Sequence, residues 1–392
     1  MLRMPIQELP TINLLIVGGG ISGLLLSILL ERKGYNTTLV EKSTEWKPIG
    51  GGITLTLNGV KMLQDIGLLD SIKPYANEIS HVDITDQLGK KLSTFDLAGY
   101  AEAYAKTYTV LRHDMHHALI SHLSDTRIHL GTSCTAIVDE GDKVKVSFTN
   151  KPECSYDLVV GCDGINSFVR RTLFGDKIND YCGYASWRFI AKGVKVQQDT
   201  LTEMWSVGKR FGIVPLKGNK IHCFASVNTQ QNSEANKKIS LHDFRVLFSC
   251  FGGYVPDLLG AIKNNCDLMY NDLEDVHLKQ FYKGRLLLIG DAAHGMTPNM
   301  TQGASMAIED AVVLAASLTD KWNIENSLKR FQSERWPRTR SIQKKSNLLG
   351  KIGQLKNPHL CRLRNYCWQR IPDRWIQNDL KKLLINSGPD LH

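Results

Sequence analysis

Apolar and polar positions near the N-terminus follow the pattern of a β-α-β unit. Residues 14–17 form an uninterrupted apolar run, as in a strand that is buried on both faces. Three consecutive glycines follow, and residues 21–30 are again mostly apolar, which predicts a buried helix. A second apolar strand, over residues 37–41, ends in Glu41. This order predicts a parallel sheet with a crossover helix at the start of the chain.

The glycines between the first strand and the first helix have the spacing of a nucleotide-binding turn. Gly18, Gly20 and Gly23 match G-x-G-x-x-G: the first allows a tight turn, the second lets backbone approach a pyrophosphate, and the third lets helix and strand pack closely. The helix N-terminus offers free N–H groups and a positive dipole end to phosphates. Glu41 is placed to accept hydrogen bonds from a ribose. This context predicts dinucleotide binding, and a plain glycine-rich turn is the alternative.

Two further buried strands end in an acidic residue beside a glycine. Residues 158–163 lead into Asp163 and Gly164, and residues 283–291 end in Gly290 and Asp291. A carboxylate at the carboxyl end of a strand, beside a helix N-terminus, lies where α/β sheets bind their ligands. A loop and a helix-like run over residues 304–318 follow Asp291. We therefore expect both segments to return to the cofactor domain.

The middle of the chain has shorter and more alternating segments. Alternation between residues 81 and 95, with a Gln-Leu-Gly turn, predicts a hairpin. A helix is expected at about 113–124, and further strands are expected at 127–138, 143–149, 184–195, 201–207, 210–216 and 220–228. The last four of these strands indicate a mostly antiparallel sheet for the substrate.

We therefore predict an α/β protein in which a Rossmann-type cofactor domain is interleaved with a mostly antiparallel β-sheet substrate domain, followed by C-terminal helices. The predicted boundaries are 1–75, 103–180 and 276–345 for the cofactor domain, 76–102 and 181–275 for the substrate domain, and 346–392 for the C-terminal helical segment. Trp368 and Trp375 in that basic segment are expected to pack on the protein, with binding to a membrane surface as the alternative.

Charge and cysteine content narrow the possible partners. The net charge of +9, from 48 Lys and Arg against 39 Asp and Glu, suits anionic ligands. The chain has no nucleic-acid-binding motif, so we expect no nucleic-acid partner. Nine cysteines without a C-x-x-C pair or a secretory signal predict reduced thiols in the cytoplasm. Residues 12–30 are long enough to span a bilayer, but their central glycines indicate a buried turn, so no transmembrane segment is expected.

Three histidines lie close together in the helix-like segment that Arg112 opens. They are His113, His116 and His117. No cysteine or carboxylate stands at a spacing that would complete a metal site with them. We therefore expect a solvated helix face here and no metal.

These motifs together resemble the single-component (class A) FAD-dependent monooxygenases of the p-hydroxybenzoate hydroxylase type. The resemblance covers about residues 11–345. It implies that Asp163 belongs to an Asp-Gly motif associated with FAD and NAD(P)H, that Asp291 holds the flavin ribityl chain, and that Arg112 contacts FAD. The residues that it assigns to the ADP half of FAD are Gly18, Gly20, Gly23 and Glu41.

Within that family the chain is most similar to the urate and salicylate hydroxylase-type members. Gly52 lies in a segment similar to one that runs near their isoalloxazine ring. The helix that begins near Gln302 and Gly303 is expected to direct its dipole at the flavin, and Pro298 is expected to shape the loop beside the ring. On the substrate side, the resemblance assigns Arg210 to a strand that places an arginine over the substrate.

Three positions depart from the family pattern. Thr301 replaces a glycine and Ser305 an asparagine in the loop before the last flavin helix, and His222 stands where urate hydroxylase has a tyrosine. A β-branched threonine tolerates positive φ poorly, so we expect Thr301 to have a negative φ. We also expect its hydroxyl to cap the helix that begins near Gly303, with a hydrogen bond toward the flavin as the alternative.

The resemblance implies the reaction. NAD(P)H (NADPH or NADH) reduces FAD, and the reduced flavin activates O₂ as a C4a-hydroperoxide that hydroxylates a small aromatic or heteroaromatic substrate. Arg210 is a candidate to pair with an anionic ring substituent and His222 to act as an acid or base, while plain strand positions are the alternatives. Trp187, Trp205 and Phe211 are candidates for the pocket or for the core. Attack on a polycyclic compound or antibiotic, or flavin binding without catalysis, remain alternative functions. A monomer or homodimer is expected.

Overall fold

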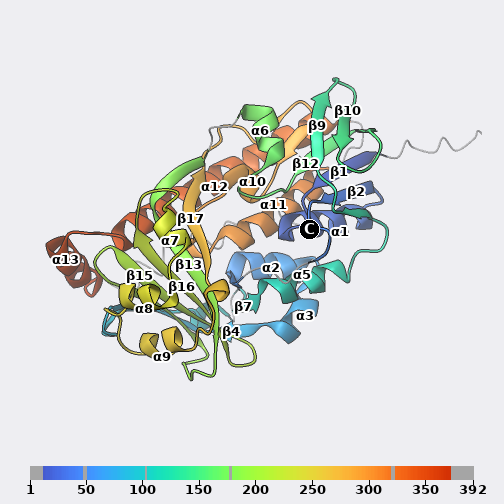
Figure 1. Ribbon diagram of the computed structural model, residues 1–392. Helices are drawn as coiled ribbons and strands as arrows, with labels where there is room; N and C mark the ends of the chain where they lie inside the picture. The colour runs from blue at the N-terminus through green and yellow to red at the C-terminus, as the bar shows by residue number, and fades with distance from the viewer. Residues whose placement is uncertain (1–11, 47–50, 102–103, 176–178, 319–322, 372–392) are drawn as a thin grey trace, which may run out of the picture.

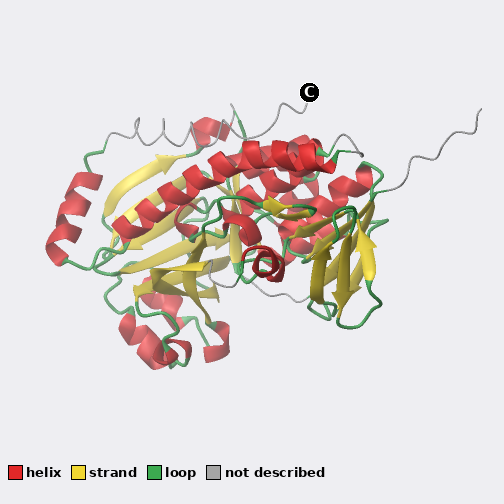
Figure 2. Ribbon diagram, turned by 90° about the horizontal axis from the view of Figure 1, so that it is seen from above, coloured by secondary structure: helices red, strands yellow, loops and turns green. Residues whose placement is uncertain are grey.

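The computed structural model describes residues 12–46, 51–101, 104–175, 179–318 and 323–371 (Figure 1). Trp375 and the outer ends of the first and last predicted segments therefore lie outside the described residues. Two large sheets lie at opposite ends of the molecule, and one long helix extends across both of them (Figure 2).

The first large sheet has six strands and the predicted Rossmann-type arrangement. Its order is β18-β19-β12-β1-β2-β8, and all neighbours are parallel except β18 and β19. The strands are β1 (Asn13–Val17), β2 (Asn36–Glu41), β8 (Arg127–Leu130), β12 (Leu158–Gly161), β18 (Tyr282–Lys283) and β19 (Leu286–Leu288). Helices α1 (Ile21–Arg32) and α11 (Gly303–Ser317) pack against each other beside it. The expected strand, turn and helix at residues 12–30 are confirmed.

The second large sheet has seven strands and is mostly antiparallel, as predicted. Its order is β17-β13-β16-β15-β14-β5-β6, and only the β14–β5 pair is parallel. The strands are β5 (His81–Asp86), β6 (Lys91–Asp96), β13 (Asn179–Lys192), β14 (Thr200–Trp205), β15 (Lys209–Leu216), β16 (Lys220–Asn228) and β17 (Met269–Val276). The hairpin expected at 81–95 is confirmed as β5 and β6. An aromatic core joins one face of this sheet to α8 (Leu241–Leu247) and α9 (Val255–Gly260).

Two three-stranded sheets and several short helices complete the fold. The small sheets consist of β3 (Gly52–Leu55), β7 (Thr107–Leu111) and β4 (Asn77–Ile79), and of β9 (Cys134–Asp139), β10 (Val144–Phe148) and β11 (Cys154–Tyr156). The short helices are α2 (Leu57–Asp65), α3 (Leu69–Ile72), η1 (Lys73–Tyr75), α4 (Ala98–Ala101), α5 (Arg112–Ile120), α6 (Phe168–Phe174), α7 (Glu234–Lys237), η2 (Asn265–Asp267), α10 (Asp291–His294) and η3 (Pro298–Met300). Strand β4, which we had expected in the substrate domain, pairs with β7 instead.

The long helix α12 (Ile324–Gly353) is continuous through the boundary that the sequence predicted between residues 345 and 346. Its buried positions continue on both sides of that boundary, so the helix has no change in packing that would divide it. After it, α13 (Pro358–Trp368) packs on the substrate sheet, where the rings of Trp368 and Trp205 lie 4.8 Å apart. The expected packing is thus confirmed for Trp368. Within the described ranges, no helix is long and apolar enough to cross a membrane.

Candidate active site

The turn between β1 and α1 is shaped by the lack of side chains. Gly18 has φ of 107°, and a Cβ atom there would lie 2.6 Å from the carbonyl oxygen of Cys162. A Cβ at Gly23 would lie 2.0 Å from the carbonyl oxygen of Gly18, so helix and turn are in direct backbone contact. Among the described residues, no atom lies within 4 Å of the position that a Cβ at Gly20 would take, and no side chain caps α1. The turn therefore leaves open space in front of free helix N–H groups, as a phosphate requires.

Glu41 stabilises this turn from the neighbouring strand. Its carboxylate accepts hydrogen bonds from the backbone N–H groups of Gly19, at 2.8 Å, and Ser43, at 2.9 Å. His116 lies 2.7 Å from the carbonyl oxygen of Gly19, and burial lowers the pKa of its imidazole. The expectation that His116 lies on a solvated helix face is therefore wrong, because α5 turns this residue toward the turn and against Trp46. In the described part of the chain, no group of histidine, cysteine and carboxylate side chains could hold a metal.

Asp163 caps a helix. Its carboxylate accepts hydrogen bonds from the backbone N–H groups of Phe168 (2.6 Å) and Val169 (3.2 Å) at the start of α6, and burial raises its pKa. Arg170 on the same helix donates to the carbonyl oxygen of Ala292, 2.9 Å away. The Asp-Gly segment thus connects α6 to α10. A direct contact of Asp163 with FAD remains a prediction.

Asp291 lies at the carboxyl end of the β19 strand segment and begins α10. Its side chain is exposed and has no hydrogen-bond partner among the described residues. Gly290 before it has φ of 60°, and its N–H donates to the buried carboxylate of Asp310 over 2.8 Å. A carboxylate without a partner, on a turn that a buried hydrogen bond fixes, is suited to bind the hydroxyl groups of a ribityl chain.

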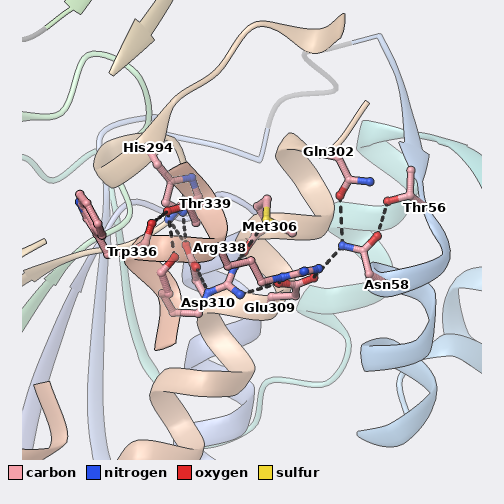
Figure 3. Close-up of polar contacts among 12 residues, drawn as sticks. Thr56, Asn58, His294, Gln302, Met306, Glu309, Asp310, Trp336, Arg338 and Thr339 are labelled. Carbon is pink, nitrogen blue, oxygen red and sulfur yellow. Dashed lines mark hydrogen bonds and ion pairs between the residues drawn. The ribbon is translucent and has the colours of Figure 1, made fainter. Parts of the chain in front are cut away.

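A buried ion cluster, consisting of His294, Glu309, Asp310, Arg335 and Arg338, lies behind this turn (Figure 3). Arg335 bridges both carboxylates and lies 2.7 Å from Asp310, while Arg338 lies 2.6 Å from Glu309. Burial alone would raise the pKa of each carboxyl group, but the positive partners outweigh it and lower both pKa values. Sequence reasoning missed this cluster, although two adjacent acids inside the apolar run 304–318 were a signal that they are paired.

The loop before α11 differs from expectation at Thr301. This residue has φ of 53°, and its hydroxyl donates to the carbonyl oxygen of Met300. The expected negative φ and the expected capping role are both wrong, because the turn after η3 requires the left-handed conformation and directs the hydroxyl away from the helix. In the part of the chain that the structure describes, no side chain caps α11, and a Cβ at Gly303 would meet no atom within 4 Å. Pro298 is exposed in η3, and Gly303 at the start of α11 is partly exposed.

Arg210 is buried with partners on both of its terminal nitrogens. It is 2% exposed, and it donates to Glu203 over 3.1 Å and to Asn299 over 2.7 Å. Asn299 follows Pro298, so Arg210 connects the substrate sheet to the loop that precedes α11. Whether it contacts substrate remains a prediction. Two of the three aromatic candidates, Trp187 and Phe211, belong to the aromatic core on the opposite face of the sheet. Trp205 pairs with Arg210 across β14 and β15 and lies on the same face, where it is buried and its Nε1 atom donates to Glu203 over 2.8 Å.

His222 lies on the face of β16 that is turned away from the aromatic core. Its side chain is packed against two glycines: a Cβ atom at Gly51 would lie 2.4 Å from the Cε1 atom of the ring, and one at Gly52 would lie 2.8 Å from the Cβ atom of His222. Burial, together with the positive charge of Arg188, lowers the pKa of His222 to about 3. The imidazole is therefore neutral at neutral pH, which disfavours an acid or base role and leaves a hydrogen-bonding role. Its Nδ1 atom has no partner in the described structure.

Arg188 was not singled out from the sequence. It lies on the same face of β13, with its side chain donating to Asn271, and burial and the nearby charge of Arg112 lower its pKa. No carboxylate of the described residues forms an ion pair with it. Arg112 is exposed at the start of α5. This side of the site therefore carries two positive charges beside a neutral imidazole.

Comparison with known proteins identifies the cofactor that this geometry fits. A family described as FAD binding domain matches residues 11–246 and 263–346. The 2-heptyl-3-hydroxy-4(1H)-quinolone synthase of Pseudomonas aeruginosa is 30% identical, over 96% of this chain and 98% of that protein. The aurachin C monooxygenase/isomerase of Stigmatella aurantiaca is 32% identical, over 97% of this chain and 96% of that protein. Klebsiella pneumoniae HpxO, solved with FAD and uric acid, has a TM-score of 0.87 at 23% identity, over 96% of this chain and 97% of that one. The chain belongs to this FAD-binding family and is a class A FAD-dependent monooxygenase of aromatic or heteroaromatic compounds.

Proposed function

We propose that this monooxygenase hydroxylates a bicyclic N-heteroaromatic ring of the 4-quinolone type. The observation that carries the proposal is the full-length similarity to a protein named as a synthase of a 3-hydroxy-4-quinolone. The overall reaction is ring–H + O₂ + NAD(P)H + H⁺ → ring–OH + H₂O + NAD(P)⁺. Bound FAD supplies the transfer of electrons from NAD(P)H to oxygen, and the chain supplies binding, orientation and exclusion of water.

The charges on the substrate-facing side of the sheet support a ring that carries a carbonyl group. A 4-quinolone has an N–H donor and a carbonyl acceptor, and attack by an electrophilic oxygen is easier when negative charge builds on that carbonyl. Arg188 has no anionic partner among the described residues, so its guanidinium is available to stabilise such charge. Neutral His222 can hydrogen-bond the ring without pairing with an acid.

The state of Arg210 supports the same choice. Because Glu203 and Asn299 already occupy both terminal nitrogens, Arg210 is not free to bind a ring carboxylate unless it breaks a buried pair. We assign it the role of positioning Asn299 and the adjacent Pro298 beside the flavin. This arrangement removes Arg210 as the group that would bind a ring carboxylate.

The cofactor assignments of the remaining residues are part of the proposal. The glycine turn and Glu41 would hold the ADP half of FAD, Asp291 the ribityl chain, and the free N-terminus of α11 at Gly303 the flavin pyrimidine ring. Gly52 and Arg112 would lie along the same cofactor. We further infer that the enzyme works in the cytoplasm with its cysteines reduced.

Turnover with a panel of ring systems tests this function. The FAD-loaded protein is mixed with NADH or NADPH and with 2-alkyl-4-quinolones, urate or 6-hydroxynicotinate, under ¹⁸O₂. We expect one ¹⁸O atom in the quinolone product and little hydrogen peroxide. Coupled hydroxylation of urate or of a ring carboxylic acid in preference to every quinolone would disprove the proposed substrate class.

Two variants sharpen this test. Arg188→Met removes the charge but keeps an unbranched side chain, so we expect kcat to fall about 100-fold, within the range for losing one electrostatic contact to the reacting atoms. FAD affinity should stay unchanged. Exposed Arg171→Met on α6 is the matched control, and it should leave both quantities unchanged.

A further inference from the structure

A continuous chain of hydrogen bonds leads from the buried ion cluster to the first residue of the flavin-side helix. Glu309 accepts a hydrogen bond from the Nδ2 atom of Asn58 on α2, over 2.7 Å. The same Nδ2 atom donates to the Oε1 atom of Gln302, over 3.1 Å. All three side chains are at least nine-tenths buried. Figure 3 shows Asn58 between Gln302 and the cluster.

The charge of Glu309 determines the orientation of both amides. An ionised carboxylate only accepts hydrogen bonds, so Asn58 must turn its NH₂ group toward it. The hydroxyl of Thr56, 2.7 Å from the Oδ1 atom of Asn58, occupies the other end of that amide as a donor. Because Nδ2 of Asn58 is a donor, Gln302 must present its carbonyl oxygen to it. The Nε2 atom of Gln302 is then directed away from Asn58 (Figure 3).

The ion cluster keeps Glu309 in the form that this chain requires. Its carboxylate is fully buried, yet Arg335 and Arg338 bind its oxygens and hold its pKa below the usual value despite the burial. A protonated Glu309 could donate to Asn58 and allow both amides to turn over. Because the arginines keep Glu309 ionised, each hydrogen bond from Gln302 through Asn58 to Glu309 has only one possible donor and one possible acceptor.

The Gln302 end of this series of hydrogen bonds lies at the place that we assign to the flavin. The Nε2 atom of Gln302 has no hydrogen-bond partner in the described residues, and Gln302 immediately precedes the uncapped N-terminus of α11. A pyrimidine edge of a flavin offers carbonyl oxygens and one N–H group, so it discriminates between an amide that presents NH₂ and one that presents oxygen.

We propose that Glu309 acts through Asn58 as a positioning residue that makes Gln302 a hydrogen-bond donor to a carbonyl oxygen of the flavin pyrimidine ring. The donor stabilises bound FAD, and it stabilises the reduced flavin more because the reduced ring carries negative charge. The inference deepens the proposed function and rests on the placement of Gln302 beside the flavin.

A double-mutant cycle on FAD binding tests this relay, by which we mean the hydrogen bonds that link Glu309, Asn58 and Gln302. Gln302→Leu should raise the FAD dissociation constant about tenfold, the size expected for one hydrogen bond. Asn58→Leu, which keeps Glu309 paired with its arginines, should have a similar effect because it frees the amide of Gln302 to turn. In the Gln302→Leu background, Asn58→Leu should add almost nothing, since both changes remove the same contact. Equal and independent effects of the two substitutions would overturn the relay.

Three further measurements separate the relay from a loss of stability. Thermal unfolding of the apo-protein reports any general damage by Asn58→Leu. Asn236→Leu, which removes an amide on α7 that donates to Thr229 and also bonds Tyr270, is the matched control and should leave FAD affinity unchanged. The midpoint potential of the bound flavin should fall in both Gln302→Leu and Asn58→Leu.

Gln302→Glu tests the amide polarity without any change at Asn58. At mildly alkaline pH its carboxylate presents only acceptors, so FAD should bind more weakly than it does to Gln302→Leu. Binding as tight as in the leucine variant would contradict the donor role. These outcomes are independent of the substrate proposal, because a protein that fails to hydroxylate quinolones can still show the coupling in FAD binding.

Discussion

At the β1–α1 end of the cofactor site the chain makes room by omitting side chains, whereas at the α10–α11 end it packs charged side chains behind the site. Gly18 and Gly23 bring backbone into direct contact, and Gly20 leaves open space. At the other end lie the five charged or titratable side chains of the buried ion cluster. Asp310 of this cluster accepts a hydrogen bond from Gly290, and Glu309 is linked to Gln302 through Asn58.

This difference corresponds to two kinds of ligand chemistry. A pyrophosphate is recognised by backbone N–H groups and a helix dipole, which require only close approach. A flavin ring and its ribityl chain require donors and acceptors of defined direction, and direction is set by side chains whose own partners leave them one orientation. We therefore expect substitutions at the two ends to differ in how they change the stability of the apo-protein and its affinity for FAD.

The largest effect is expected at Gly18. In Gly18→Val the new side chain would meet backbone of Cys162 and Asp163 at less than 3 Å, in a conformation that a β-branched residue does not adopt. The apo-protein should lose stability and FAD binding should be abolished. Gly20→Ala is the matched control, because a Cβ atom there would meet no atom of the described residues within 4 Å. It should leave the unfolding temperature of the apo-protein unchanged and weaken only FAD binding, and equal unfolding temperatures for both variants would contradict the comparison.

At the other end, Asp310→Asn should destabilise the apo-protein by about 3–5 kcal/mol, since it leaves buried Arg335 without one of its charges. Denaturant unfolding measures this loss. Exposed Glu325→Gln, which breaks a solvent-exposed ion pair with Lys329, is the control and should leave the free energy of unfolding nearly unchanged.

The same variant should change the pH dependence of stability. The folded-state pKa values of Glu309 and Asp310 are lowered, so their contribution is present above the unfolded-state pKa of about 4 and is lost as the pH falls through the folded values. The wild type should therefore lose more free energy of unfolding than Asp310→Asn on acidification below about pH 4. Parallel curves for the two proteins would show that Asp310 is not ionised in the folded state.

Asp291→Ala should affect the cofactor alone. The exposed carboxylate has no partner among the described residues, so its removal should leave apo-protein stability unchanged. The loss of charged hydrogen bonds to the ribityl chain should cost about 1.5–3 kcal/mol of FAD binding, or roughly 10–100-fold in affinity. Fluorescence titration with FAD measures the change, and an unaltered dissociation constant would remove Asp291 from the site.

The sequence could predict the glycine end because its information is local. Gly18, Gly20, Gly23 and Glu41 stand within one β-α-β unit, where spacing determines geometry. The buried chain at the other end joins Asn58, Gln302 and Glu309 with arginines from α12, and no spacing rule relates such distant positions. On the substrate sheet, the sequence predicted the strands, but it could not show which aromatic side chains belong to the core, or that Arg188 lacks an anionic partner among the described residues while Arg210 has one.

Thr301 shows why a rule about residue preference can fail at a single position. Threonine disfavours positive φ, yet the turn between η3 and α11 imposes φ of 53° on it, because neighbours on both sides are held by burial and helix packing. The fold overrides the preference of threonine for negative φ, and the left-handed conformation lowers the free energy of unfolding. That cost can be measured.

The smallest effect is therefore expected for Thr301→Gly. A left-handed conformation costs a non-glycine residue about 1–2 kcal/mol, and glycine loses about 0.5–1 kcal/mol more backbone entropy on folding. Among the described residues, the side chain of Thr301 bonds only to the adjacent carbonyl of Met300, so little else is lost. Thr301→Gly should raise the free energy of unfolding by up to about 1 kcal/mol with FAD affinity unchanged. Thr301→Ala serves as the control, since it keeps the strain and should give no gain. A stabilising alanine and a neutral glycine would mean that the hydroxyl, and not the backbone, is the source of the cost.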